Sequence, residues 1–193
     1  MASKFFALFS RMKYINRWAL MRNTASESLS QHSLEVAAFA HALAIIGNRR
    51  LGKNYNAERA ALLGIYHDMP EIITGDMPTP VKYFSPEIRT AFGAVEKVSQ
   101  DRLLSALPED LRDDFCGLLT ENDDKDLLRL IKAADKLSAL VKCIEERKAG
   151  NSEFTGAEKS TLQAIESMDV PEAVIFMDEF MGAYEHTLDE LSE

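Results

Sequence analysis

Apolar residues recur at helical spacing along nearly the whole chain. The clearest case follows residues 28–31, whose sequence SLSQ has the form of a helix-starting capping box. The apolar stripe behind it comprises Val36, Phe39, Ala40 and Leu43. Because this spacing keeps the four side chains on one face, we predict an amphipathic helix that begins at Ser28 and is closed by Gly47.

Cap and breaker residues indicate where further helices begin and end. Asn56 suits an N-cap, and Ser85 with Pro86 marks a helix that runs toward residue 107. Pro108 opens a shorter helix that ends near residue 120, and Asp123 or Asp124 opens a long one through residue 148. Residues 74–83 are expected to be irregular because they contain glycine and two prolines.

The two ends of the chain also carry apolar stripes. Residues 1–18 are expected to form an amphipathic first helix that packs in the core or a dimer, rather than a signal peptide or membrane anchor. Pro171 is expected to open a single last helix, whose stripe packs within the chain or forms a dimer seam. That stripe comprises Val174, Met177, Met181, Tyr184, Leu188 and Leu191.

No convincing β alternation, repeat or low-complexity linker interrupts this pattern. We therefore predict an all-α fold, a single helical bundle over residues 1–193. The net charge of -9 argues against a surface that binds a nucleic-acid polymer. No stretch is long enough to cross a bilayer, and two distant cysteines are typical of reduced thiols in a cytoplasmic protein.

His67 and Asp68 are adjacent where a helical pattern stops before Pro70. A carboxylate at that end of a helix faces the negative end of the dipole, and a nearby cation would relieve this. His32 and Asp135 lie on the apolar stripes of two other predicted helices. Each has an alternative interpretation: His32 as a hydrogen-bonded core residue, and Asp135 as an ion-pair partner of a neighbouring lysine.

Taken together, these residues form a mixed nitrogen and oxygen set. Two histidines and two carboxylates suit Mn, Co, Fe, Zn or Ni. An octahedral ion with four protein ligands keeps positions for water and a substrate oxygen, which is typical of a metal-dependent hydrolase.

Four segments in order, INRWALMRN, SLSQHSLEVA, YHDMPEIITGDMPTPVKYF and IKAADKLSALVKCIEE, resemble the bacterial 5′-deoxynucleotidases. The H…HD…D pattern within them resembles the wider HD-domain phosphohydrolase superfamily. The resemblance runs from about residue 5 to residue 190 and implies an HD-domain helical bundle. It implies that a divalent ion, Co, Mn or another transition metal, is held by His32, His67, Asp68 and Asp135.

The resemblance also assigns residues around the ion. It implies that Glu71 is the catalytic acid or base, and that Arg17 orients the substrate phosphate. It implies that Trp18 lies against the sugar, where a bulky ring disfavours a 2′-hydroxyl. The implied substrate contacts also include His32, Asp68, Asp76, Met77, Pro78, Thr79 and Asp135.

Two departures from the family pattern bear on these assignments. Pro70 precedes Glu71 and suits a fresh helix start, so we expect it to leave Glu71 in place. Lys136 follows Asp135 and is expected to point away from the ion.

The resulting hypothesis is a metal-dependent 5′-deoxynucleotidase, which hydrolyses deoxyribonucleoside 5′-monophosphates and is expected to form a homodimer. One alternative is another HD phosphohydrolase that acts on a dNTP, an alarmone or a cyclic dinucleotide. The other is a non-catalytic nucleotide sensor that retains the metal. The sensor would not need Glu71 for catalysis, so substitution of that residue separates it from the enzymes.

Overall fold

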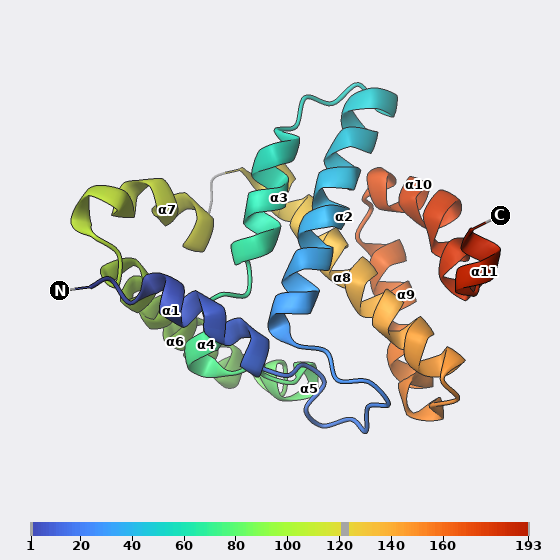
Figure 1. Cartoon of the computed structure of the whole chain (residues 1–193), viewed down its shortest axis with the longest axis horizontal. Helices are drawn as coiled ribbons and strands as arrows, with labels where there is room; N and C mark the ends of the chain where they lie inside the picture. The colour runs from blue at the N-terminus through green and yellow to red at the C-terminus, as the bar shows by residue number, and fades with distance from the viewer. Residues whose placement is uncertain (1, 121–123, 193) are drawn as a thin grey trace.

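The computed structural model describes residues 2–120 and 124–192, and within these ranges the chain is helical without a sheet (Figure 1). The β-type pairing found within these ranges is an isolated antiparallel bridge between Asn16 and Ser28. The predicted all-α fold is confirmed. No described helix is long and apolar enough to span a membrane.

The larger helices supply the frame, and short helical turns connect them. The elements are α1 (Phe5–Phe9), η1 (Ser10–Tyr14), α2 (Leu29–Arg50), α3 (Ala57–Tyr66), α4 (Glu71–Thr74), α5 (Thr79–Lys82), α6 (Pro86–Ser105), η2 (Glu109–Leu111), α7 (Arg112–Leu119), α8 (Lys125–Lys148), η3 (Ser152–Phe154), α9 (Thr155–Ser167), α10 (Pro171–Phe180), η4 (Met181–Glu185) and α11 (Leu188–Leu191).

The predicted helix starts are confirmed by their caps. The Ser28 side chain accepts from the Gln31 backbone, and the Gln31 side chain accepts from the Ser28 backbone, which completes the capping box. The side chains of Asn56, Ser85 and Asp124 each accept a backbone N–H three residues later. Asp124 is thus the cap of α8, whereas Asp123 lies outside the described residues.

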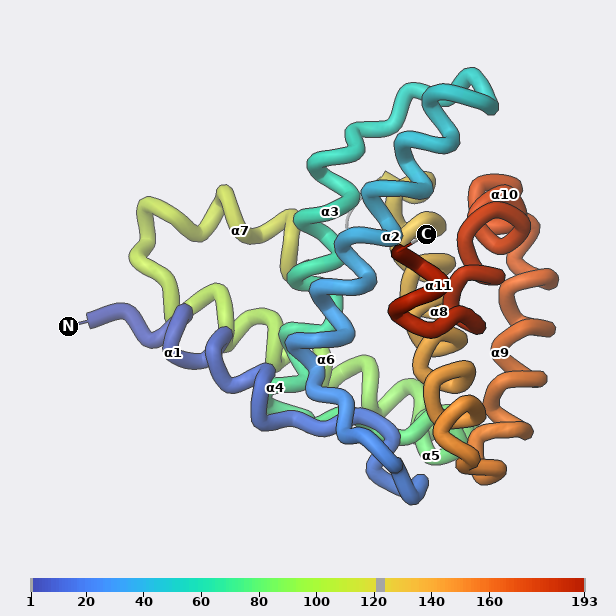
Figure 2. Tube along the Cα trace, turned by 45° about the vertical axis from the view of Figure 1, so that its right-hand side comes forward, coloured from blue at the N-terminus to red at the C-terminus, as the bar shows by residue number. Residues whose placement is uncertain are grey.

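The main core lies where α2, α3 and α8 pack together (Figures 1 and 2). Gly64 makes this packing close, because a Cβ atom there would lie 2.6 Å from the Ala37 Cα atom of α2. The α2 stripe of Val36, Phe39, Ala40 and Leu43 is buried in this core, as its spacing predicted. Buried side chains of α9 and α10 complete this core.

A second apolar cluster gathers the N-terminal segment with α4, α6 and α7. It comprises Phe5, Met12, Leu29, Met69, Leu103, Leu107 and Leu119. The predicted first helix is shorter than expected, because α1 ends at Phe9 and a 3₁₀ turn follows. Phe5 and Met12 pack in the chain's own interior as predicted, whereas the Phe6 side chain is largely exposed.

The prediction that Gly47 closes the second helix is wrong. The helix α2 continues to Arg50, and Gly52, with φ 65°, lies just beyond its end. Gly47 lies inside α2, where an added Cβ atom would come within 2.5 Å of the Tyr55 ring. The glycine therefore serves a close packing contact rather than a helix end.

The prediction of one continuous last helix is also wrong. The chain divides after Pro171 into α10, η4 and α11, so the near-heptad stripe does not share one face. Met181 is buried, whereas Val174, Leu188 and Leu191 are exposed. The fresh helix start expected at Pro70 is confirmed as the single turn α4, whereas the helix α9 was not predicted; the segment expected to be irregular also contains α5.

Candidate active site

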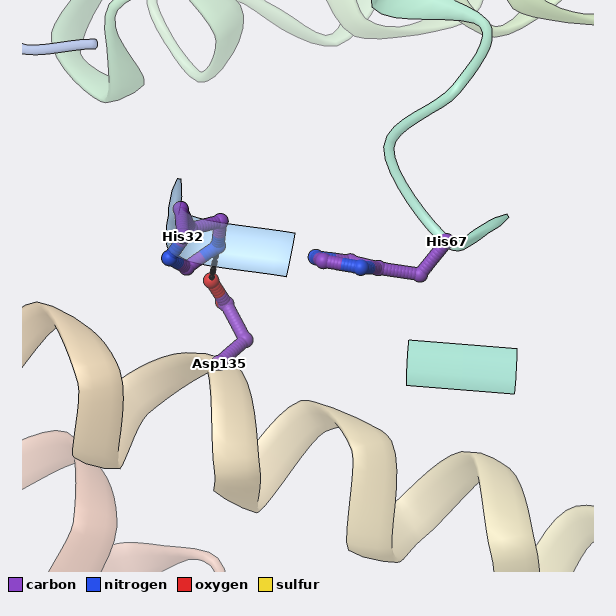
Figure 3. A group of neighbouring side chains, drawn as sticks. All are labelled: His32, His67 and Asp135. Atoms are coloured by element: carbon purple, nitrogen blue, oxygen red, sulfur yellow. Dashed lines mark ion pairs between the residues drawn. The ribbon is translucent and has the colours of Figure 1, made fainter. Parts of the chain in front are cut away.

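His32 comes from the first turns of α2, and its side chain is fully buried. Its Nε2 atom lies 3.1 Å from Oδ1 of Asp135, which projects from α8 (Figure 3). Across the same space, the ring of His67 lies with its centroid 5.4 Å from that of His32. Three segments far apart in sequence thus bring polar side chains to one buried point.

The proton positions of the two imidazoles follow from their hydrogen bonds. Nδ1 of His67 lies 2.7 Å from the carbonyl oxygen of Gly64, and because a carbonyl only accepts, Nδ1 carries the proton. Nδ1 of His32 lies 2.9 Å from Oγ of Ser138, which in turn donates to Glu35 at 2.6 Å. With its single hydrogen directed at Glu35, the Ser138 oxygen accepts from His32.

In the neutral form of each ring, the Nε2 atom thus presents its lone pair to the shared space; without a cation there, burial lowers the pKa of His67 but the neighbouring Asp68 carboxylate raises it above its usual value. Both Nε2 atoms are buried without a hydrogen-bond partner. Asp68 closes the arrangement, since its Oδ2 atom lies 2.9 Å from Nε2 of His67 and 3.6 Å from Nε2 of His32. Buried lone pairs without donors are costly to leave unpaired, and a cation at their centre would satisfy all of them.

Ligand atoms of His32, His67 and Asp135 all lie within 4.8 Å of one another, a grouping that could hold a metal ion. The fourth predicted ligand, Asp68, contacts both histidines from the side of the α3 terminus. The structure thus brings together all four residues that the resemblance implied. Their donor chemistry and their unpaired atoms fit a divalent transition metal.

The charges of these groups are mutually dependent. Burial alone would raise the pKa of Asp135, but the contact with His32 and the charge of Lys136 lower the pKa below its usual range. Burial likewise opposes ionisation of Asp68, yet His67 beside it lowers the pKa of that carboxyl. Burial lowers the pKa of His32. Both carboxylates are therefore ionised and able to bind a cation.

Lys136 does not point away from this group as expected. Its Nζ atom lies 3.1 Å from Oδ2 of Asp135, so the ion-pair interpretation of Asp135 is correct for that oxygen. The other oxygen, Oδ1, faces His32. One carboxylate thus serves both contacts.

Arg17 and Trp18 reach the site from the segment between η1 and α2. Nη2 of Arg17 lies 3.7 Å from Oδ1 of Asp135, and the Trp18 ring lies against the ring of Phe154 at 5.3 Å. Burial opposes the charge on Arg17, but Glu27 and Asp135 raise the pKa of its guanidinium. A fixed positive group consequently stands beside the carboxylates.

Glu71, in the first turn of α4, is an acidic group that its surroundings alter strongly. Burial, together with the charges of Asp68 and Asp76, raises its pKa to about 9, and its Oε2 atom is buried without a hydrogen-bond partner. Asp76 also has a raised pKa, because burial outweighs the charge of Arg17. Glu71 therefore holds a proton at neutral pH beside the candidate ligands.

The remaining predicted substrate residues lie in the following segment. The Trp18 backbone lies close enough to Asp76 to lower the pKa of that carboxyl, so this segment meets the N-terminal one. Met77 and Pro78 then lead into α5, which begins at Thr79. Their contact with a substrate stays a prediction.

Sequence reasoning missed three residues that support the site. Glu27 accepts from both Arg17 and Trp18, and Ser138 with Glu35 orients His32. A signal existed for the last two, since Glu35 follows His32 by three residues and Ser138 follows Asp135 by three. Glu27 lies outside any helix, so no periodicity marks it.

The model of the family described as 5′-deoxynucleotidase YfbR-like matches residues 4–184. The chain belongs to this family. A 5′-deoxynucleotidase of Enterobacter sp. (strain 638) is 48% identical over 192 residues, covering 99% of this chain and 96% of the relative. The 5′-deoxynucleotidase YfbR of Escherichia coli (strain ATCC 8739) matches with the same identity and coverage.

Solved structures share the fold of this YfbR-like chain. An HD-domain phosphohydrolase from Listeria innocua superposes with a TM-score of 0.80 at 23% identity, over 98% of this chain and 89% of that one. The HD phosphohydrolase of cyanophage S-2L, bound to dA and one catalytic Zn²⁺ ion, gives a TM-score of 0.66 at 17% identity. This match covers 98% of this chain and 99% of that one. The HD-domain fold predicted from the four segments is therefore confirmed.

Proposed function

We propose that this protein is a metal-dependent 5′-deoxynucleotidase that converts deoxyribonucleoside 5′-monophosphates to deoxynucleosides and phosphate. The observation that carries the proposal is the pair of buried, unpaired Nε2 atoms of His32 and His67 facing Asp68 and Asp135. The names of the 48% identical relatives support the reaction. We assign the activity to one domain that spans residues 1–193.

His32, His67, Asp68 and Asp135 would hold the ion in this proposal. When bound, a divalent ion lowers the pKa of a coordinated water and polarises the phosphoryl group. Arg17 stands beside Asp135, where its guanidinium would offset charge that develops on the phosphoryl oxygens. The phosphate would therefore lie beside the ion and within reach of Arg17.

Glu71 would supply the proton that the leaving group needs. In the reaction the bond between water oxygen and phosphorus forms, and the bond between phosphorus and the sugar O5′ breaks. Because its pKa is raised to about 9, Glu71 can donate a proton to O5′ at neutral pH, and it regains one from the attacking water. The products are a neutral 5′-hydroxyl and inorganic phosphate.

Trp18 would distinguish the two sugars. Its ring is held against Phe154 and lies beside Arg17, whose guanidinium carbon is 5.8 Å from the indole centroid. A sugar bound next to the phosphate would meet this ring, which disfavours an added 2′-hydroxyl. The segment 76–79 would complete the substrate site.

A phosphate-release panel tests the proposal. Metal-free protein would be supplied with Mn, Co, Zn or Mg and offered dNMPs, NMPs, dNTPs and an alarmone. We expect phosphate release from dNMPs that depends on the ion and is lost in Arg17→Ala and Glu71→Gln. Release from dNTPs or alarmones alone would favour another HD phosphohydrolase. Nucleotide binding without any release, unchanged in Glu71→Gln, would favour a sensor.

We also propose that the enzyme works in the cytoplasm as a homodimer. The exposed apolar side chains Val174, Leu188 and Leu191 offer surface for a second copy. Light scattering during size-exclusion chromatography tests this assembly, and a mass of one chain at micromolar concentration would contradict it.

A further inference from the structure

Glu27 lies just before α2, and its side chain is mostly buried. A single oxygen atom of its carboxylate, Oε2, receives two hydrogen bonds. Nη1 of Arg17 donates at 2.9 Å, and Nε1 of Trp18 donates at 2.8 Å. Two adjacent residues that the proposed function places on the phosphate and on the sugar thus share one acceptor.

The backbone around this acceptor is unusual. Trp18 has a φ angle of 61°, in the left-handed region that residues other than glycine rarely adopt. Such a conformation persists only where neighbouring contacts hold it. Here the Arg17 N–H donates to the Glu27 carbonyl at 3.0 Å, and the Met21 N–H donates to the Trp18 carbonyl at 2.9 Å.

Each of the two side chains that share this acceptor, Arg17 and Trp18, is also held at a second point. Arg17 directs Nη2 toward Asp135 at 3.7 Å, so the bond from Nη1 to Glu27 fixes the plane of the guanidinium. The Trp18 indole packs on Phe154, a buried ring, with an interplanar angle of 57°. The bond to Glu27 then fixes the rotation of the indole about its side-chain bonds.

We propose that Glu27 is a positioning residue that couples phosphate orientation to sugar selection, through the one oxygen that it offers to Arg17 and Trp18. This inference rests on the proposed function. Because the acceptor is shared, movement of either side chain changes the position of the other. Loss of Glu27 should therefore weaken discrimination between dNMP and NMP even though Glu27 itself need not touch the sugar.

Three substitutions separate the parts of this proposal. Glu27→Ala removes the acceptor, Glu27→Gln keeps a side-chain oxygen, and Trp18→Phe keeps an aromatic ring without the N–H. Loss of a charge-assisted hydrogen bond typically changes an equilibrium constant, or a ratio of kcat/KM values, about tenfold. We expect the ratio of kcat/KM for dNMP over NMP to fall about that much in Glu27→Ala and to be largely retained in Glu27→Gln.

A double-mutant cycle tests the route of the effect. If Glu27 acts on the sugar through the indole, Glu27→Ala should change the ratio little further once Trp18→Phe is present. Additive effects would overturn the proposed coupling. Where Glu27→Ala gives no folded protein, Trp18→Phe alone carries the test, and a wild-type ratio in that variant would overturn the proposal.

Trp18 is the one tryptophan of the chain, which provides a readout that needs no substrate. Time-resolved fluorescence anisotropy should show larger fast motion of the indole in Glu27→Ala than in the wild type. Glu153→Ala is the matched control, because Glu153 accepts from the Arg22 backbone and forms no hydrogen bond or ion pair with Arg17 or Trp18 in the described part of the chain. Equal motion in wild type and Glu27→Ala would overturn the inference.

Failure of this inference differs from failure of the proposed function. If the wild-type protein releases no phosphate from any dNMP, the function fails, and the anisotropy comparison still decides whether Glu27 holds Trp18. If the wild type is active and selective but Glu27→Ala matches it in both ratio and anisotropy, only the role of Glu27 fails.

Discussion

Ser138 on α8 determines which ring nitrogen of His32 on α2 is free. Its Oγ atom accepts from Nδ1 of His32 at 2.9 Å because its own hydrogen is directed to Glu35. The Nε2 atom of His32 consequently faces the candidate ion with its lone pair exposed. Histidine ligands are commonly oriented in this way by a partner on the other nitrogen.

Replacement of Ser138 by alanine should weaken metal binding without removing a ligand. Removal of such an orienting partner typically costs about 10- to 100-fold in metal affinity. Competition of metal-free protein with a chelating dye would measure this loss for Mn and Co. Ser138→Thr keeps the hydroxyl and serves as the matched control, and equal affinities for Ser138→Ala and wild type would contradict the prediction.

Replacement of Glu71 by glutamine should lower kcat by about 10²- to 10⁴-fold, the usual contribution of a general acid. In the wild type, kcat should fall as alkaline pH removes the proton from Glu71, whose pKa is raised to about 9. Glu71→Gln should lack this alkaline decline. A pH–rate profile with saturating dNMP measures both effects, and an identical profile in the variant would remove Glu71 from the proton transfer.

The same carboxyl predicts a pH dependence of stability in the metal-free protein. A carboxyl whose pKa is raised on folding costs stability as pH rises from its unfolded value, near 4.5, through its folded value near 9. The melting temperature of metal-free Glu71→Gln should therefore decline less over this interval than that of the wild type. Parallel declines in differential scanning fluorimetry would count against a buried, protonated Glu71.

Addition of a divalent ion should stabilise the fold. A ligand at 100 times its dissociation constant contributes about 2.7 kcal/mol when it binds only the folded state. We expect the melting temperature of metal-free protein to rise with Mn or Co concentration. His67→Ala should lose most of this rise, whereas His186→Ala, near the C-terminus and outside the ligand group, should keep it; a rise of the same size in both would refute the assigned site.

Replacement of Gly64 by alanine should destabilise the protein by about 1–3 kcal/mol, the usual cost of overpacking. The added Cβ atom would lie 2.6 Å from the Ala37 Cα atom, and a backbone atom cannot move aside cheaply. Gly93→Ala is the matched control, because nothing lies within 4 Å of its added Cβ atom. Urea unfolding of the two variants would test the difference, and equal losses would show that α2 and α3 are less tightly packed than described.

The sequence was most informative where local chemistry acts over a few residues. The caps at Ser28, Asn56 and Ser85 follow from local hydrogen-bonding chemistry, and these helix starts were predicted correctly. Gly47 was misassigned because a glycine at a helix end and a glycine under a packed ring look the same without the position of Tyr55. The break after α10 was missed although Gly182 lies just beyond its end, because a single glycine within an apolar stripe is tolerated in a helix.

In the site, too, sequence patterns identified some residues and missed those whose role depends on tertiary contacts. Inward spacing and family motifs identified His32, His67, Asp68 and Asp135, and the structure brings these four together. Glu27, which accepts hydrogen bonds from Arg17 and Trp18, was missed because it lies in a non-helical segment. Its two hydrogen bonds depend on the left-handed backbone at Trp18, which the sequence pattern did not indicate.

The site lies at the boundary between the two apolar clusters. The helices that carry His32 and Asp135 are anchored in the main core, whereas the turn that carries Glu71 is fixed by Ile72 and Ile73, which pack on the second cluster. Met69 of the second cluster directly follows the candidate ligands His67 and Asp68, so the two interiors meet at the candidate metal-binding group. Repacking of either cluster is therefore expected to move a candidate ligand as well as to change the stability of the fold.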